Sequence, residues 1–183
     1  MTASELYPRL LGPSWMTLDA AIRQAHVVNG AATGRLVIRY GTSVGARLLR
    51  RALRLPPAGE AHATRLAITR DGQRERWART IGRRSLVTLQ RGLSDGRLAE
   101  RIGIAELRFQ LDVADGRLRY SPAGAAVPLG RWAIPLPRSL APRVEACEEP
   151  ADGRGAHVRV RISLPLIGFF MSYEGTVVAE TMT

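Results

Sequence analysis

Charged and apolar side chains share one face of an expected strand at residues 74–81. Successive side chains of a strand point to opposite sides, so four of them face the same way: Glu75, Trp77, Arg79 and Ile81. A carboxylate or guanidinium that faces an apolar interior must form an ion pair or serve a ligand, because unpaired burial of a charge is costly. If the sheet encloses a cavity, we expect Trp77 to supply surface, Arg79 to contact an anion and Glu75 to be a candidate acid or base.

A second expected strand, at residues 97–102, repeats this mixture. Glu100 shares its face with the apolar Leu98, which makes Glu100 the other candidate acid or base of the same cavity. The alternative is that these charges lie at the rim of the sheet, where Arg79 pairs with Glu75 or Glu100 and all of them reach water.

Two aromatic residues complete the candidate site. Phe109 lies in the alternating run 107–113, and Tyr173 lies in the last expected strand, at residues 169–178. We expect both to line the cavity and contact a ligand, with Tyr173 as a third candidate catalytic group. The alternative for Tyr173 is a core tyrosine whose hydroxyl bonds to a neighbour.

A G-x-S-x-G motif at Gly41–Gly45 separates an expected strand from an expected helix. This is the setting of a nucleophile elbow, and Asp112 or Asp115 followed by His157 gives the chain order of a hydrolase triad. The expected fold argues against it, because an α/β-hydrolase needs further βα units downstream, whereas the chain after residue 61 alternates with period two. We therefore expect a tight turn in which Ser43 caps the helix, and which has room for an anion at the helix start.

That helix, expected at residues 44–53, carries basic and apolar residues on different sides. The basic side holds Arg47, Arg50, Arg51 and Arg54, and the other side holds Val44, Leu48, Leu49 and Leu53. Such a helix can dock on a membrane surface or on nucleic acid, or simply face solvent. The low aromatic content and the interleaved acidic residues argue against a specific nucleic-acid partner.

Composition excludes several kinds of chemistry. The chain has 183 residues, 45% hydrophobic and 23% charged, and a formal net charge of +11 that comes entirely from arginine, since there is no lysine. Schiff-base, pyridoxal and P-loop chemistry are therefore excluded. The single Cys147 excludes an internal disulfide and a thiolate zinc cluster, and no two of the three histidines have metal-ligand spacing. We expect no metal and no cofactor.

The elements that must position these residues are mostly antiparallel strands. Asp-Gly turns at 71–72, 95–96 and 115–116 separate short alternating runs, which favours meanders over βαβ units. We predict an α+β, β-rich domain over residues 1–183, with a helical part at about 1–60 and strands at about 61–180. Its strongly curved antiparallel sheet or partly open barrel is covered on one side by the N-terminal helices. The chain shows neither a signal peptide nor a membrane span, and we expect a cytoplasmic protein.

The order of several short motifs resembles DUF4166, a bacterial family of domains of unknown function. The resemblance extends over nearly the whole chain and rests on Leu55–Gly59 (LPPAG), Trp77–Arg79 (WAR), Gly96–Leu98 (GRL) with Glu100-Arg101, Asp115–Leu118 (DGRL), Leu136-Pro137, Leu140–Pro142 (LAP) and Ile162–Gly168 (ISLPLIG), followed by Tyr173 and Gly175. It implies an uncharacterised domain that occurs alone or fused behind Rossmann-type oxidoreductase or epimerase domains, and hence a separate oxidoreductase as one candidate partner. It supplies no catalytic residues, and the chain has no G-x-G-x-x-G motif.

These observations predict a domain that binds an apolar small molecule or lipid carrying an acidic group. Two alternatives remain at this stage. One is a cofactor-independent isomerase, cyclase or hydrolase that uses Glu100 or Glu75 with Tyr173, and the other is an interaction module for a separate oxidoreductase.

Overall fold

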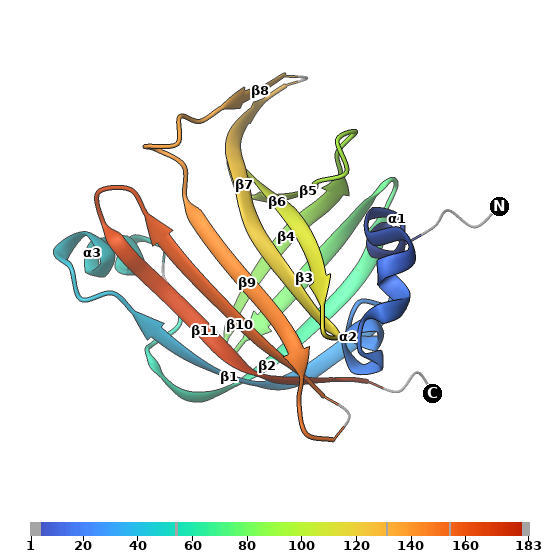
Figure 1. Ribbon diagram of the computed structural model, residues 1–183. Helices are drawn as coiled ribbons and strands as arrows, with labels where there is room; N and C mark the ends of the chain where they lie inside the picture. The colour runs from blue at the N-terminus through green and yellow to red at the C-terminus, as the bar shows by residue number, and fades with distance from the viewer. Residues whose placement is uncertain (1–4, 54, 131, 154, 181–183) are drawn as a thin grey trace.

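A closed antiparallel barrel forms the body of the computed structural model, which describes residues 5–53, 55–130, 132–153 and 155–180 (Figure 1). Three α-helices and one 3-10 helix accompany it: α1 (Leu6–Leu11), η1 (Gly12–Thr17), α2 (Ala20–Ala25) and α3 (Val44–Ala52). The strands within these residues are β1 (Ala31–Tyr40), β2 (Gly59–Asp71), β3 (Arg74–Ile81), β4 (Arg84–Gly92), β5 (Leu98–Ile102), β6 (Ala105–Ala114), β7 (Arg117–Leu129), β8 (Trp132–Pro135), β9 (Arg143–Pro150), β10 (Gly155–Leu164) and β11 (Gly168–Ala179).

The sheet closes because its two ends meet. The strand order is β6-β5-β4-β3-β2-β1-β11-β10-β9-β7-β8, and β6 also pairs with β7, so that ten strands form the barrel. β8 pairs only with β7 and stands out from the barrel as a hairpin (Figure 1). The predicted β-rich fold with N-terminal helices is confirmed. The sequence left open a strongly curved sheet or a partly open barrel, and the structure is a closed barrel.

Local sequence explains why these strands meet as hairpins. Asp115 and Gly116 both have positive φ, at 52° and 74°. This is the geometry of a two-residue hairpin turn whose twist matches that of the flanking strands. Glycine adopts it freely and aspartate tolerates it, so Asp-Gly joins β6 to β7 without strain on either strand.

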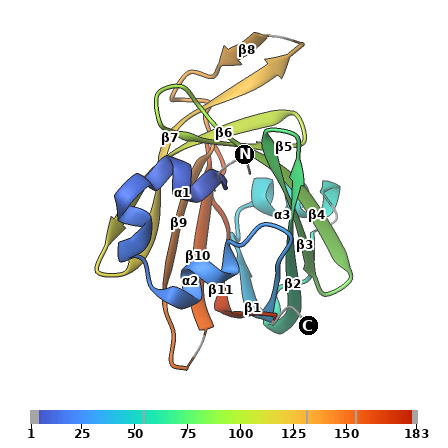
Figure 2. The same ribbon diagram turned by 90° about the vertical axis from the view of Figure 1, so that its right-hand side faces the viewer.

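The N-terminal helices close one end of the barrel. α1 and α2 lie across it in Figure 2, and Tyr7 and Ile22 from these helices are buried in the main hydrophobic core together with side chains of the strands. The carboxylate of Asp19 begins α2 by accepting a hydrogen bond from the backbone N–H of Ala21 at 2.8 Å. We call this the closed end.

The opposite end, which we call the open end, carries α3. This helix connects β1 to β2 and packs through Ala46 against Ile38, Phe170 and Met171. Ser43 caps it as predicted, accepting a hydrogen bond from the N–H of Ala46 at 3.2 Å. Much of the apolar side of α3 does not pack, because Val44 and Leu48 are exposed. Arg54, which the sequence groups with the arginines of α3, lies outside the described residues.

No helix within the described residues is both long enough and apolar enough to cross a bilayer.

Candidate functional site

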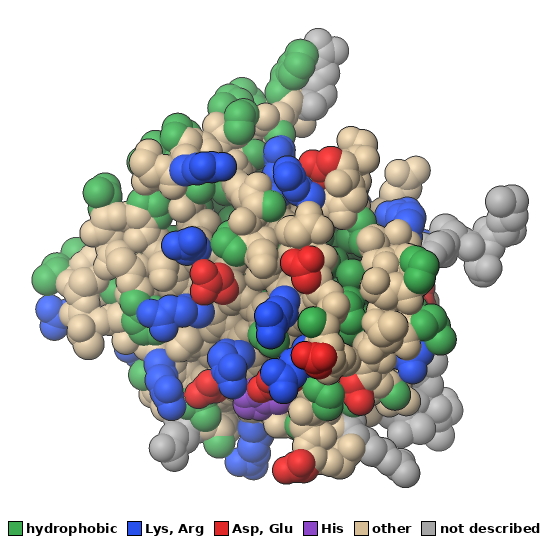
Figure 3. Space-filling model, in the orientation of Figure 1, with side chains coloured by type: hydrophobic (Ala, Val, Ile, Leu, Met, Phe, Trp, Pro, Cys, Tyr) green, Lys and Arg blue, Asp and Glu red, His purple; other side chains and the backbone are tan. Residues whose placement is uncertain are grey.

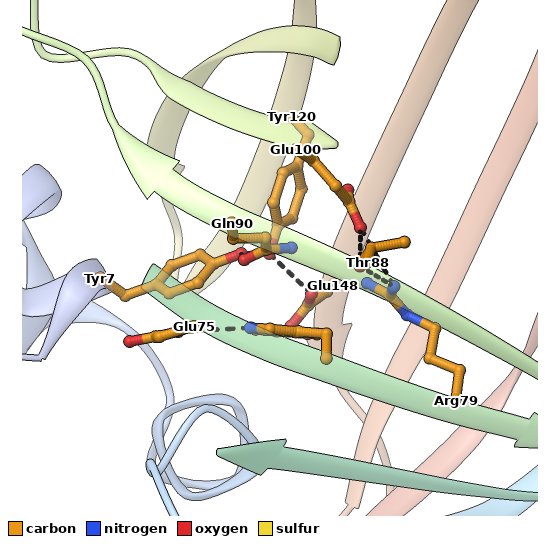
Figure 4. Close-up of polar contacts among 9 residues, drawn as sticks. Tyr7, Glu75, Arg79, Thr88, Gln90, Glu100, Tyr120 and Glu148 are labelled. Atoms are coloured by element: carbon orange, nitrogen blue, oxygen red, sulfur yellow. Dashed lines mark hydrogen bonds and ion pairs between the residues drawn. The ribbon is translucent and has the colours of Figure 1, made fainter. Parts of the chain in front are cut away.

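A polar cluster lies inside the barrel between its two ends. Arg79 of β3 donates from Nη1 to Oε1 of Glu100 on β5 at 3.0 Å and to Oγ1 of Thr88 on β4 at 2.8 Å. The Thr88 hydroxyl in turn donates to the same carboxylate oxygen at 2.6 Å (Figure 4). Strand pairing sets this geometry, because β4 lies between β3 and β5 and the three side chains point into the barrel. The predicted inward face of β3 and β5 is therefore present.

Several contacts hold the Arg79 side chain in place, but some of its hydrogen-bond donors have no partner among the described residues. Its guanidinium carbon lies 5.0 Å from the centre of the Trp77 ring, a cation–π contact. Burial works to lower the pKa of Arg79, but the charge of Glu100 more than compensates and raises the pKa above its ordinary value. The side chain remains 19% exposed, and its Nε and Nη2 groups have no hydrogen-bond partner among the described residues. Arg79 therefore offers free donors to the barrel interior.

Tyr173 of β11 faces the same space. It lies opposite Ile38 on β1 and Val160 on β10, so its ring has apolar neighbours on both sides. Burial raises the pKa of the Tyr173 hydroxyl, while the nearby charge of Arg79 acts to lower it. The hydroxyl has no hydrogen-bond partner among the described residues, and the side chain is partly exposed. The alternative of a core tyrosine with a bonded hydroxyl therefore does not describe this side chain.

Glu75 and Phe109 have different surroundings from the Arg79 cluster. Glu75 is buried at the closed end, where Oε1 accepts from the backbone N–H of Leu6 at 2.9 Å and Oε2 accepts from Nε1 of Trp77 at 3.2 Å. It anchors α1 to β3. Phe109 is buried in the main core with its ring edge against Tyr120, at 6.1 Å between ring centroids. Neither side chain offers a free polar group to the space beside Arg79.

A second polar network, which sequence reasoning missed, forms the floor below the Arg79 cluster. The Tyr7 hydroxyl donates to Oε1 of Gln90 at 3.0 Å and lies 3.2 Å from the Tyr120 hydroxyl. The Tyr120 hydroxyl donates to Oε1 of Glu148 at 2.9 Å, and Oε2 of Glu148 lies 2.8 Å from Nε2 of His26. Figure 4 shows Tyr7 and Glu75 beside α1, with Arg79 and Thr88 away from it.

The charged and hydroxyl groups of this network support one another, although Nδ1 of His26 is buried without a hydrogen-bond partner among the described residues. Burial opposes ionisation of Glu148, but the attraction of His26 and the hydrogen bonds from His26 and Tyr120 hold the pKa of Glu148 below its ordinary value. Burial raises the pKa of Tyr7 and of Tyr120 well above the usual value, so both hydroxyls keep their protons. The network thus fastens α1 and α2 to the barrel and separates the Arg79 cluster from the closed end. One sequence signal was available, since Glu148 shares its strand face with Val144 and Ala146.

The G-x-S-x-G motif does not assemble a triad. The Ser43 hydroxyl donates to the carbonyl oxygen of Ile167 at 3.3 Å and caps α3. Asp115 and His157 lie toward the closed end, in the β6–β7 turn and at the start of β10, whereas Ser43 is at the open end. Among the described residues no group of three histidine, cysteine or acidic side chains is arranged to hold a metal ion.

Comparison with known proteins identifies a family and a fold. The family DUF4166, described as a domain of unknown function, matches residues 18–177. No curated protein matches the chain. Among solved structures, a DUF3598-family protein of unknown function from Nostoc punctiforme is similar, with a TM-score of 0.54 and 14% identity. The match covers 89% of this chain and 49% of that one, so the chain spans about half the length of the Nostoc protein. At this identity the likeness concerns the fold alone.

Proposed function

Because the chain belongs to the DUF4166 family, whose description assigns no function, we propose one from the geometry of the barrel. The protein binds an amphipathic small molecule or lipid inside the barrel, reached from the open end. The apolar part of the ligand lies against the inward apolar side chains, and its acidic group is held by Arg79 and Tyr173.

The observation that carries this proposal is a pair of hydrogen-bonding groups inside the barrel that have no partner among the described residues. Arg79 has free donors and Tyr173 has a free hydroxyl, although both side chains point inward. Both side chains are only partly buried, and none of their unbonded polar atoms is cut off from solvent, so these atoms are accessible to an incoming ligand. The neighbouring Leu66, directly opposite Arg79 on β2, is only partly buried and supplies apolar surface at the same level.

Because Glu100 already neutralises the charge of Arg79, the acidic group of a ligand gains only a modest electrostatic attraction. The ligand does not replace Glu100, because Nη1 of Arg79 is held by both Glu100 and Thr88. Instead it uses the free Nε and Nη2 edge, where an acidic group completes the coordination of the guanidinium. We therefore expect a carboxylate to bind more tightly than its ester, by a modest factor.

A dansyl-labelled fatty acid and its methyl ester test this proposal by fluorescence titration. We expect the acid to bind more tightly than the ester, and Tyr173→Phe to lower the affinity for the acid about fivefold, the equivalent of one hydrogen bond of about 1 kcal/mol. The matched control is Tyr40→Phe, which removes a hydroxyl that bonds to the carbonyl oxygen of Pro56 at 2.8 Å. Equal affinities of wild type and Tyr173→Phe, or no binding of either probe, would reject the assigned site.

A second candidate function follows from the carboxylate of Glu100. Its Oε1 accepts both hydrogen bonds, while Oε2 has no partner among the described residues, and the charge of Glu100 acts on the nearby Tyr173. A carboxylate with a free oxygen beside a tyrosine is suited to move a proton on a bound ligand. On this reading Glu100→Gln binds the ligand but does not convert it. Conversion by the variant at the wild-type rate would exclude Glu100 as the base.

A further inference from the structure

Large apolar side chains stand in solvent at the open end. Val44 and Leu48 of α3 are 63% and 64% exposed, and Leu166 in the β10–β11 turn is fully exposed. Figure 3 shows hydrophobic side chains along its left-hand edge, where α3 and this turn lie in Figure 1. Exposed leucines at the tip of a turn and on a helix have no role in the core of the barrel.

The helix and the turn are in direct contact. The Ser43 hydroxyl bonds to the carbonyl oxygen of Ile167, and Gly45 packs so closely that an added Cβ would lie 3.1 Å from Cγ1 of Ile167. Leu166 has a φ of 64°, a left-handed conformation that costs free energy for a branched side chain. The fold thus holds the Leu166 side chain in solvent, in a turn that contacts the start of α3.

Arginines of the same helix line a basic, open pocket. It has a volume of about 500 Å³ and is lined by Arg47, Arg50, Arg51, Leu55 and Arg84. None of its arginines forms an ion pair with a described residue, whereas elsewhere Arg39, Arg65 and Arg91 pair with carboxylates. The guanidinium of Arg50 also stacks 4.5 Å from the ring centre of Tyr40, which fixes its position.

We propose that the open end docks on an anionic lipid bilayer. The contact surface, which we call the rim patch, consists of the apolar Val44, Leu48 and Leu166 and the basic Arg47, Arg50, Arg51 and Arg84. The apolar side chains enter the acyl boundary while the unpaired arginines meet lipid phosphates, as in other interfacial amphipathic helices. Neither a free phosphate nor a nucleic acid would bury the exposed apolar side chains of Leu166 and Val44, whereas a bilayer would. In this orientation the open end of the barrel faces the membrane. The proposal does not depend on which ligand the barrel binds.

Sedimentation with vesicles tests the basic part of the rim patch. We expect binding to vesicles of phosphatidylglycerol mixed with phosphatidylcholine, weakening as salt rises, and much weaker binding to phosphatidylcholine alone. Arg47→Gln combined with Arg51→Gln should lower the affinity about thirtyfold, from about 1 kcal/mol for each arginine near the surface. The charge-matched control is Arg70→Gln combined with Arg76→Gln, exposed residues on β2 and β3 outside the rim patch. Equal loss in both double variants would overturn the assignment.

The apolar part needs its own comparison. Leu166→Asn removes the apolar side chain and introduces a residue that tolerates the left-handed backbone conformation of this position. It should lower vesicle binding several-fold. Met16→Gln, an exposed apolar residue near the closed end, should leave vesicle binding unchanged. If Leu166→Asn binds vesicles like wild type, or if a DNA duplex binds as tightly as the anionic vesicles, the surface is a general polyanion site and the proposal fails. Titration of the rim-patch variants with the dansyl-labelled fatty acid keeps this outcome separate from ligand binding in the barrel.

Discussion

Replacing Arg79 by methionine tests whether the ion pair inside the barrel is a structural unit. Methionine keeps the apolar stem of arginine but removes the guanidinium that holds Glu100 and Thr88. The carboxylate of Glu100 then keeps one hydrogen bond, from Thr88, in an apolar surrounding. We therefore expect the protein to fold with reduced stability.

The magnitude follows from exposure. Exposed ion pairs contribute about 0.2–1 kcal/mol, and breaking a fully buried pair costs about 3–5 kcal/mol. The side chains of Arg79 and Glu100 are 19% and 13% exposed, between these two cases, so Arg79→Met should cost about 2 kcal/mol. For a chain of this size that corresponds to a decrease in Tm of about 4–8 °C.

Urea unfolding of a double-mutant cycle measures the cost directly. In the background of Glu100→Gln no charge is left without a partner, so Arg79→Met should cost about 1–2 kcal/mol less there than in the wild type. The control is Arg65→Met, which removes an exposed partner of Glu180 and should leave the unfolding midpoint nearly unchanged. Additive effects of the two substitutions, or no cost for Arg79→Met, would refute the reasoning that this pair is sequestered from water.

Three further predictions concern the closed end and the strands. Tyr7→Phe leaves Oε1 of Gln90 buried without its donor and should lower the free energy of unfolding by about 1–3 kcal/mol, measured in urea; no change would mean that water enters the floor. The folded-state pKa of Glu148 lies below the ordinary value of 4.5, so its contribution to stability is complete above that pH and is lost as the pH falls through the folded pKa. Unfolding curves recorded from pH 7 downward should therefore show a shallower acid loss in Glu148→Gln than in wild type, and identical slopes would contradict this. Gly34→Ala places a Cβ against the backbone carbonyl of Thr176 on the neighbouring strand, and it should lower the Tm in a thermal melt by several degrees; an unchanged Tm would show that β1 and β11 can separate.

The alternation of residues along the strands predicted which side chains face into the barrel, but not which of them form ion pairs with one another. Period two places Arg79 and Glu100 on inward faces, and the structure confirms this orientation. Which acid pairs with Arg79 depends on β4 lying between β3 and β5, a register that the sequence alone left open between Glu75 and Glu100. The Asp-Gly turns predicted hairpins correctly because their backbone preference is local.

The site residues that the sequence did not predict form hydrogen bonds with partners far away in the sequence. Tyr7 bonds to Gln90, and His26 bonds to Glu148 across 122 positions. No local pattern marks a helical tyrosine or histidine as the partner of a residue on a distant strand. The exposure of Leu48 was also not predicted, because amphipathic spacing normally identifies the side of a helix that packs, whereas here much of that side stays in solvent.

Native mass spectrometry of the gently purified protein, followed by denaturing extraction, tests the central claim most directly. If the barrel holds an amphipathic ligand, the native mass exceeds that of the chain by one small molecule, and the excess disappears on denaturation. The extracted molecule should be apolar with an acidic group and should rebind more weakly to Tyr173→Phe. A native mass equal to that of the chain, before and after incubation with the extracted cell lipids, would contradict a ligand-binding barrel. It would leave an enzyme that releases its product, or an interaction module for a separate oxidoreductase, as the remaining proposals.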